Sequence, residues 1–181
     1  MNIRWLLVLL FLLIGCDSGE PPQKVLGQVP QTAANTRAQT SDPSGAQTAL
    51  VKGPGFEGVI FPANSKTTRV SVDLYPKGAS FWTPAESDIL SAEKALTPFL
   101  KQSHNPEAPE ILKKLDTYKR QYRGVVLNGH KQIFIRFFCE ISPDSWMTEE
   151  TIVMDGGSCF FNLHYSPETK ALSNFWVNGE A

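Results

Sequence analysis

Two cysteines, Cys139 and Cys159, are the residues whose type and spacing most directly suggest chemistry. As a disulfide they would close a loop of about twenty residues and stabilise the fold by roughly 3 kcal/mol in the chain-entropy model. As free thiols they would be buried apolar groups, or one of them would be a nucleophile. A thiol nucleophile needs a base within hydrogen-bond reach, but His164 is expected on the strand face opposite Cys159 and His130 beside a turn. The pair therefore favours a disulfide or two buried thiols over thiol catalysis.

The remaining titratable residues lack the spacing that is typical of a metal or acid–base site. The three histidines, His104, His130 and His164, lie in different predicted elements, whereas zinc ligands usually occur in close pairs. The segment Asp155-Gly156-Gly157 lacks the alternating acids of a calcium loop, so we expect a bulge or a sharp bend there. Acidic residues are expected to be solvated in a loop between two strands: Glu140, Asp144, Glu149, Glu150 and Asp155. We therefore expect no catalytic residue, no metal and no cofactor.

Aromatic side chains give the stronger indication of binding. Neighbouring strand residues point to opposite faces of a sheet, so Phe160 and Phe161 must diverge, as must Phe175 and Trp176. Four residues are then expected on a second sheet face as a candidate partner-binding surface: Phe134, Phe138, Phe160 and Trp176. Large exposed apolar patches usually mark interaction sites, and tryptophan is a favoured anchor. The alternative is that another strand, the helix or the end of the N-terminal segment covers this face.

The apolar pattern predicts the elements that would position these groups. Thr83-Pro84-Ala85-Glu86 is typical of a helix start, and the helical spacing continues to about Thr97, where Pro98 is expected to end or kink the helix. A second short helix is predicted over 107–115. Asn128-Gly129 favours a type I′ turn and predicts a hairpin between 118–127 and 131–139.

Period-two patterns predict further strands over 68–75, 151–165 and 171–177. The result is an α+β fold with one main helix packed on a four-stranded antiparallel meander, a topology similar to the cystatin-like and nuclear-transport-factor-like folds. In this register Cys139 faces about Thr151, and Cys159 lies roughly 26 Å further along at the usual strand rise. A disulfide would then require the chain to fold back at the two glycines. Such a fold hosts inhibitors, enzymes and binding modules alike, so it does not assign a function.

The N-terminal segment predicts where the chain resides. A charged head at Met1 to Arg4 precedes an apolar run that is typical of a secretory signal peptide. Leu13-Ile14-Gly15-Cys16 resembles the bacterial lipobox. The resemblance implies a signal peptide over 1–15 and a lipid, palmitate included, on Cys16. The apolar run has about half of the roughly 20 residues that a transmembrane helix needs.

A lipobox implies an extracytoplasmic chain that is lipid-anchored to a bacterial membrane. Asp17 directly after the cysteine resembles the signal that retains enteric lipoproteins in the inner membrane, with the outer membrane as the alternative. This compartment is oxidising, and an even pair of cysteines that remains after lipidation suggests a disulfide.

Composition divides the rest into a lipidated disordered tether over 16–55 and a single α+β domain over 56–181. The tether has no aromatic residue before Phe56 and is rich in Pro, Gly, Ser, Thr, Gln and Ala, so it cannot bury enough apolar surface to offset its ordering entropy. The chain carries 17 basic and 18 acidic residues. Such a near-neutral balance lacks the basic patch that nucleic acid binding requires.

The C-terminal third resembles a group of small uncharacterised bacterial secreted and lipoprotein sequences. The resemblance rests on Phe137-Phe138-Cys139, Asp155-Gly156-Gly157 and Cys159-Phe160-Phe161, and it implies no activity. We therefore expect a lipid-anchored cell-envelope binding domain whose partner is an envelope protein, and these residues favour a binding function over an enzymatic one. The alternative is a small extracytoplasmic hydrolase-like enzyme with a pocket between helix and sheet, which would use the region of Asp155 and His164.

Overall fold

The hairpin at the centre of the sheet follows from its turn residues. The computed structural model describes residues 47–65, 75–140 and 145–180. Strand β4 (Lys119–Leu127) runs antiparallel to β5 (His130–Phe138). Asn128 and Gly129 between them have φ angles of 50° and 81°, the left-handed conformation that a type I′ turn requires at both positions. The predicted hairpin is therefore confirmed, together with the chemistry of its turn.

Around this hairpin the sheet is larger and more mixed than the predicted four-stranded antiparallel meander. On one side, β1 (Ala49–Gly53) pairs with β2 (Phe56–Phe61), and β2 runs parallel to β4. On the other side follow β6 (Phe160–Ser166) and β7 (Ala171–Val177), both antiparallel to their neighbours. The order is β1-β2-β4-β5-β6-β7, and the short β3 (Ser80–Trp82) pairs with β4 beyond the end of β2. The α+β class is correct, whereas the predicted size and the purely antiparallel pairing of the sheet are not.

Strand β1 lies within the segment that composition assigns to a tether. It pairs with β2 along its whole length, from Ala49 opposite Ile60 to Gly53 opposite Phe56, and Val51 is buried. Strand β1 is stabilised by backbone pairing and by one buried valine, and the segment around it remains polar in composition. Composition alone therefore could not predict this strand. The segment 1–46, with the predicted signal peptide and lipidation residue, lies outside the described residues, as does 66–74, which holds most of the strand predicted over 68–75.

Helix α2 (Glu86–Gln102) is longer than the sequence predicts. Its N-terminus lies slightly later than expected, because the carboxylate of Asp88 accepts from the Ala85 N–H at 3.2 Å while Thr83 Oγ1 accepts from the Ala63 N–H at 2.9 Å. Pro98 lies inside the helix, although it removes one backbone donor. The turns around it place Leu96 and Leu100 in the core. Their burial offsets the lost hydrogen bond, so the helix continues to Gln102.

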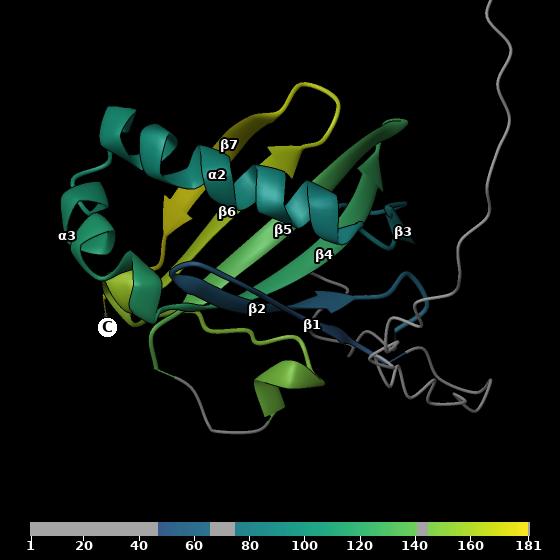
Figure 1. Ribbon diagram of the computed structural model, residues 1–181, viewed down its shortest axis with the longest axis horizontal. Helices are drawn as coiled ribbons and strands as arrows, with labels where there is room; N and C mark the ends of the chain where they lie inside the picture. Colours follow the sequence, from purple (N-terminus) through teal and green to yellow (C-terminus); the bar gives the residue numbers. More distant parts are fainter. Residues whose placement is uncertain (1–46, 66–74, 141–144, 181) are drawn as a thin grey trace, which may run out of the picture. The chain divides into compact units, whose positions relative to one another are not determined.

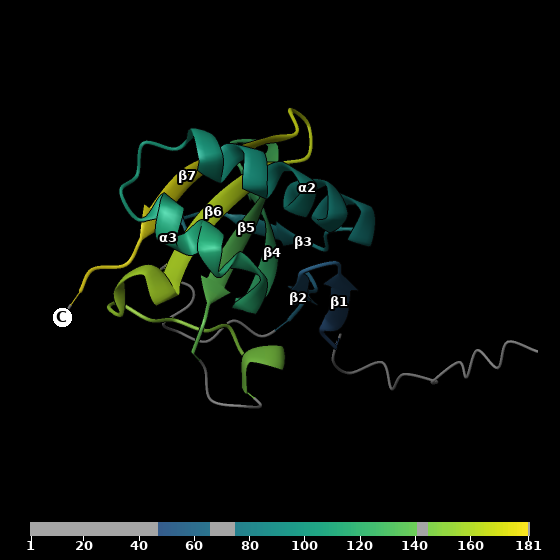
Figure 2. The same cartoon turned by 60° about the vertical axis from the view of Figure 1, so that its left-hand side comes forward.

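Helix α2 and a second described helix, α3 (Ala108–Lys113), cover one face of the sheet. Figure 1 shows α2 lying across the central strands, and Figure 2 shows α2 and α3 on the same side. Between helix and sheet lies the main apolar core, in which α2 contributes every third or fourth residue, as the helical period requires. The buried residues of this core are Val51, Ile60, Ile89, Ala92, Leu96, Leu100, Ala108, Ile111, Tyr118, Tyr122, Ile133, Ile135, Phe137, Phe161, Leu163 and Tyr165.

The segment before β6 differs most from prediction. Residues 151–159 are not a strand, and β6 begins only at Phe160, opposite Phe138. Gly156 and Gly157 have φ angles of 94° and 55° and lead into a 3₁₀ turn at Gly157–Cys159. The glycines therefore reverse the chain before the strand rather than bulge within it. Because the register shifts accordingly, Cys159 lies beside Cys139 and not a strand length away.

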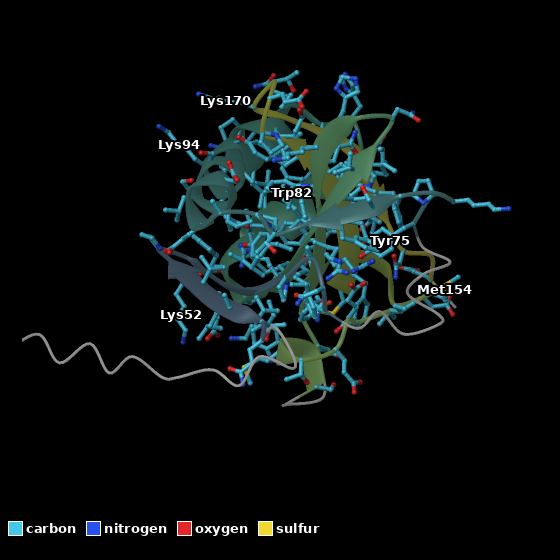
Figure 3. The ribbon with its side chains drawn as sticks, turned by 90° about the vertical axis from the view of Figure 1, so that its right-hand side faces the viewer. Lys52, Tyr75, Trp82, Lys94, Met154 and Lys170 are labelled. Carbon is cyan, nitrogen blue, oxygen red and sulfur yellow. A yellow bond between two sulfur atoms is a disulfide. The ribbon has the colours of Figure 1, made fainter. Side chains whose placement is uncertain are left out.

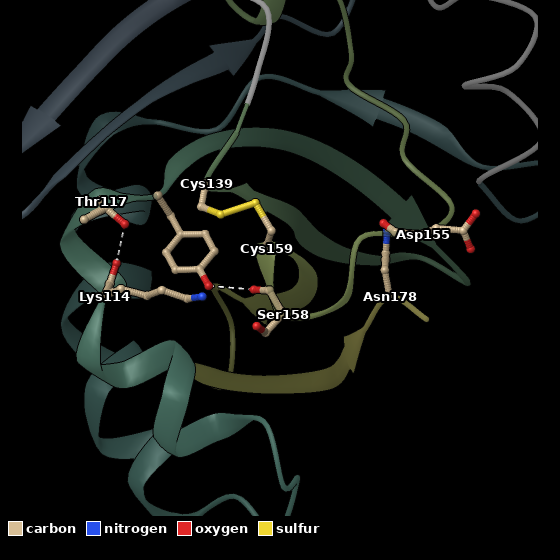
Figure 4. The surroundings of a disulfide bond; sticks show 8 residues. Lys114, Thr117, Cys139, Asp155, Ser158, Cys159 and Asn178 are labelled. Atoms are coloured by element: carbon tan, nitrogen blue, oxygen red, sulfur yellow. Dashed lines mark hydrogen bonds between the residues drawn. A yellow bond between two sulfur atoms is a disulfide. The ribbon is translucent and has the colours of Figure 1, made fainter. Parts of the chain in front are cut away.

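A disulfide joins Cys139 to Cys159, with their Cα atoms 5.0 Å apart (Figure 4). The Cys139 N–H also donates to the Cys159 carbonyl at 3.0 Å, and the Tyr118 hydroxyl donates to the Ser158 carbonyl at 2.6 Å. These contacts attach the start of β6 to the end of β5. In this bonded form neither sulfur offers a thiolate.

Candidate functional site

The sheet face opposite the helices carries a buried polar cluster that composition alone did not indicate. Arg136 Nη1 donates to Glu150 Oε2 at 3.1 Å, and the Tyr75 hydroxyl donates to the same oxygen at 2.8 Å. Arg136 Nη2 donates in turn to the Tyr75 hydroxyl at 2.9 Å, and Arg123 Nε lies 3.5 Å from Glu150 Oε1. The side chains of Arg123 and Glu150 are only 1% and 3% exposed. Glu150, expected to be solvated, is instead the anion that holds two arginines in the fold.

The loop that carries Glu150 is attached to the sheet by Gln121 of β4. Gln121 Nε2 donates to the carbonyls of Trp146 and Glu149 at 2.6 and 2.7 Å, and Gln121 Oε1 accepts from the Thr151 N–H at 2.8 Å. Through these bonds the loop lies over the sheet, and Trp146 is buried against Phe138, with ring centroids 6.0 Å apart. The loop therefore covers much of the face that was expected to be open.

Two of the four aromatic residues predicted to bind a partner are buried, one by this loop and one by other segments. Phe138 lies under Trp146, and Phe134 packs between Tyr75, at 5.4 Å between centroids, and the imidazole of His164, at 3.7 Å. Phe160 is partly buried. A local pattern could not show this, because Phe138 is covered by a loop that Gln121 attaches to the sheet and Phe134 is covered by Tyr75, which is distant in the sequence.

Trp176 remains exposed and lies between two cavities. The first, of about 300 Å³, is lined by residues that include Gln132, Phe134, His164 and Asn174. The second, of about 210 Å³, lies beside 151–154 and 177–179. Arg136, Asn162 and Trp176 line both cavities, and we call the two together the Trp176 groove.

The rim of the Trp176 groove is unusually apolar for a surface. Trp176 is 51% exposed and Met154 is 76% exposed, and Val153 is also exposed. Figure 3 shows Met154 and Tyr75 on the side of the sheet away from Lys94 of α2. Large exposed side chains beside a concavity are the pattern of a binding site. Of the four predicted binding aromatics, Trp176 is thus the one best placed to contact a ligand.

His164 lines the first cavity as an uncharged polar side chain. Burial first, and the charge of Arg136 second, lower the pKa of His164 to about 4. Its Nδ1 lies 2.9 Å from Asn174 Nδ2, and because an amide nitrogen only donates, Nδ1 accepts and the single ring proton is on Nε2. Asn174 adopts a left-handed φ of 51° where the pairing of β6 with β7 shifts register. Such a bulge redirects side chains and often accompanies a functional site.

A third cavity, of about 690 Å³, lies on the helix side of the sheet, and a different cluster lines it. Glu93 of α2 accepts from the Tyr122 hydroxyl at 2.8 Å and lies 3.3 Å from Arg120 Nε. Burial, opposed by the charge of Arg120, raises the pKa of Glu93. Arg120 also donates to the carbonyls of Tyr118 and Leu115 at 2.6 and 3.0 Å. This second cluster therefore places a carboxyl group and an arginine at the wall of a cavity.

The other sequence candidates are dispersed. His130 lies 3.2 Å from Glu168 at the surface, and His104 is exposed near the end of α2. Asp155 lies beside Asn178 (Figure 4) and lines neither cavity of the Trp176 groove, so it does not share a cavity with His164. Within the described ranges, no three His, Cys, Asp or Glu side chains converge as metal ligands would.

Sequence reasoning missed the residues that build both clusters, although one signal was present. Gln121, Arg123 and Arg136 occupy one face of the two central strands, where charged residues are rarely buried without partners. Charged residues on a central strand are therefore a pointer to a buried network. The partners Glu93 and Glu150 gave no such signal, because Glu93 lies among acids and a lysine on a helix and Glu150 lies among acids in a loop, where such residues are usually solvated.

Comparisons with family models, with curated proteins and with solved structures found no match. Among the described residues, no helix is both long enough and apolar enough to cross a membrane.

Proposed function

We propose that this chain is a lipid-tethered binding domain of the bacterial cell envelope and that it holds its partner in the Trp176 groove. The observation that carries the proposal is the half-exposed indole of Trp176 between two cavities. A tryptophan at the centre of a concave surface is the side chain that most often dominates binding energy. When a partner covers an exposed indole, apolar surface is removed from water, and this stabilises the complex.

The lipobox and the disulfide support the location. Diacylation of Cys16 would supply the two acyl chains that stable anchoring needs. A disulfide such as Cys139–Cys159 persists in oxidising compartments and is rare in the cytosol. The cluster around Glu150 gives the site rigidity, because Arg136 lines the groove while its two terminal nitrogens are bonded to Glu150 and Tyr75. A preorganised wall lowers the entropic cost of binding.

Oxidative footprinting tests this proposal without knowledge of the partner. Hydroxyl radicals oxidise exposed Met154 and Trp176 readily, and the extent is read by mass spectrometry in intact envelopes and in the purified protein. We expect both residues to be protected in the envelope, while Leu90, exposed on α2, is oxidised equally in the two preparations. Equal oxidation of Met154 and Trp176 in both would mean that the groove is empty in the envelope, and the proposal would fail.

A second candidate function is the hydrolase-like enzyme, and Glu93 is the observation that favours it. A carboxyl whose pKa is raised by burial, at the wall of a cavity, is suited to general acid catalysis. The residues would then be Glu93 and Arg120 and not Asp155 and His164. Hydrolysis of chromogenic esters or glycosides by the full chain, lost in Glu93→Gln and retained in Trp176→Ala, would support this candidate. Absence of turnover across such a panel would remove it.

A further inference from the structure

The groups that line the first cavity define the chemistry of its ligand, on the premise that the Trp176 groove is the binding site. Arg136 is the only lining residue there with a permanent charge, and both of its terminal nitrogens are bonded to Glu150 and Tyr75. His164, with its pKa near 4, is uncharged at neutral pH. Among the described residues, no acidic side chain lines the cavity, so a cation finds no partner there, and the one cation that lines it is hydrogen-bonded to Glu150 and Tyr75. This lining favours a ligand that is held by hydrogen bonds rather than by ion pairs.

The same cavity is rich in uncommitted hydrogen-bonding groups. Gln132 Oε1 is buried and has no hydrogen-bond partner among the described residues. The His164 Nε2–H and the amide of Asn162 also line the cavity and make no hydrogen bond within the part of the chain that the structure describes. A buried acceptor without a partner costs free energy, and a turn of the Gln132 side chain, which lines the cavity, would bring this oxygen to a ligand donor. Because amides both donate and accept, the matching ligand carries several groups that do the same, as hydroxyls do.

The aromatic groups add a flat apolar surface. Trp176 lies at the boundary of both cavities, and Phe134, stacked on His164, lies in the wall of the first. A pyranose ring has a flat face of C–H bonds, which packs on an indole, and hydroxyls around its edge, which reach planar amides. Each cavity lies at or below the lower end of the range of about 300–1,000 Å³ for ligand pockets, so each is suited to a single small ring.

We propose that the Trp176 groove binds a neutral saccharide chain, with one sugar ring in each cavity and the indole of Trp176 between them. An extended peptide that adds to the edge of β7 is disfavoured, because the left-handed Asn174 interrupts the regular backbone that strand addition requires. A cationic ligand is disfavoured, because among the described residues Arg136 and no acidic side chain lines the first cavity. Saccharides are abundant outside the cytoplasm, where the lipobox would place this domain.

Isothermal titration calorimetry on the full chain tests the ligand class. The protein is kept in a polyoxyethylene detergent, because sugar-headgroup detergents would compete, and is titrated with the trisaccharide of N-acetylglucosamine and with cellotriose. We expect binding of at least one of them at micromolar to millimolar concentrations. Trp176→Ala should weaken it at least tenfold, Trp176→Tyr should retain a ring and weaken it less, and Leu90→Ala should leave it unchanged.

A second variant examines the unpaired acceptor. Gln132→Met has nearly the same shape but removes Oε1, so it should also weaken binding several-fold while near-UV circular dichroism stays that of the native chain. Failure of both sugars to bind would overturn the saccharide assignment, and so would binding that neither Trp176→Ala nor Gln132→Met changes. Footprint protection in the envelope without saccharide binding would leave the proposed function intact and indicate a protein partner instead.

Discussion

Replacing Glu150 with glutamine should be among the most destabilising single changes in this domain. A glutamine side chain has almost the shape of glutamate but no charge, so two buried guanidinium groups would lose their anion. Arg123 and Arg136 lie 3.5 and 3.1 Å from the carboxylate. Removing one partner of a buried ion pair typically costs about 3–5 kcal/mol. Since glutamine keeps one acceptor for Arg136 and Tyr75, we expect a loss of about 3 kcal/mol in the free energy of unfolding, the low end of that range.

Urea denaturation is the appropriate assay, because a guanidinium salt would alter the electrostatics under study. With a slope of about 2 kcal/mol per molar urea, a loss of about 3 kcal/mol lowers the unfolding midpoint by about 1.5 M. The matched control is Glu149→Gln, since Glu149 is the adjacent acid, is exposed and makes its bond to Gln121 through its backbone carbonyl. It should change the midpoint by less than about 0.3 M, as exposed charges contribute little.

A double-mutant cycle separates the ion pair from general damage to the loop. If Arg136→Met is combined with Glu150→Gln, part of the loss should be recovered, because fewer buried cations are then left without an anion. The reasoning would be refuted if Glu150→Gln and Glu149→Gln unfolded at the same urea concentration. That result would mean that the arginines do not depend on Glu150 for their burial.

Three other perturbations follow from the geometry. The variant Cys139→Ala/Cys159→Ala should unfold about 3 kcal/mol more easily, as loop entropy predicts for the twenty-residue separation, and should no longer respond to reductant, whereas a reductant-sensitive variant would mean that the bond lies elsewhere. Because burial lowers the folded pKa of His164 from 6.5 to about 4, its contribution to stability is present above pH 6.5 and is lost as pH falls towards 4. At 1.4 kcal/mol per pKa unit this contribution is at most about 3.5 kcal/mol. His164→Gln should flatten the dependence of stability on pH between 6.5 and 4, and an unchanged dependence would disprove the assignment. Cys16→Ala should leave the chain without acyl groups by intact mass and absent from the washed membrane fraction, and a membrane-bound, acylated variant would contradict the lipobox prediction.

The parts of the fold that could be predicted are those that local chemistry specifies. Asn128-Gly129 predicts the central hairpin because few residue pairs tolerate positive φ twice in succession. The apolar period of residues 86–97 predicts α2, because burial of one helix face requires it. The end of α2 and the start of β6 were predicted wrongly, because burial of Leu100 and the reversal at Gly156-Gly157 depend on contacts with distant segments.

For the candidate site, the sequence indicated which residue types could bind a partner, but it did not indicate which of them are exposed. The sequence indicated Trp176 as a binding aromatic, and the same reasoning chose Phe134 and Phe138, which are buried. All three lie on alternating strand positions, so periodicity cannot distinguish them. What distinguishes them is which distant segment covers each one. The loop that Gln121 attaches to the sheet, 25 to 30 positions away, covers Phe138, and Tyr75 packs on Phe134.

The sequence by itself determined the α+β class, the hairpin, the main helix and the prediction of a lipidated N-terminus, because each of these rests on a local pattern of a few adjacent residues. Only the tertiary structure decided which charges are buried, which aromatic remains exposed and how β1, β2 and the loop before β6 join the sheet. These features arise when segments far apart in the chain exclude water from one another. Burial depends on these long-range contacts, so it cannot be predicted from any single stretch of sequence.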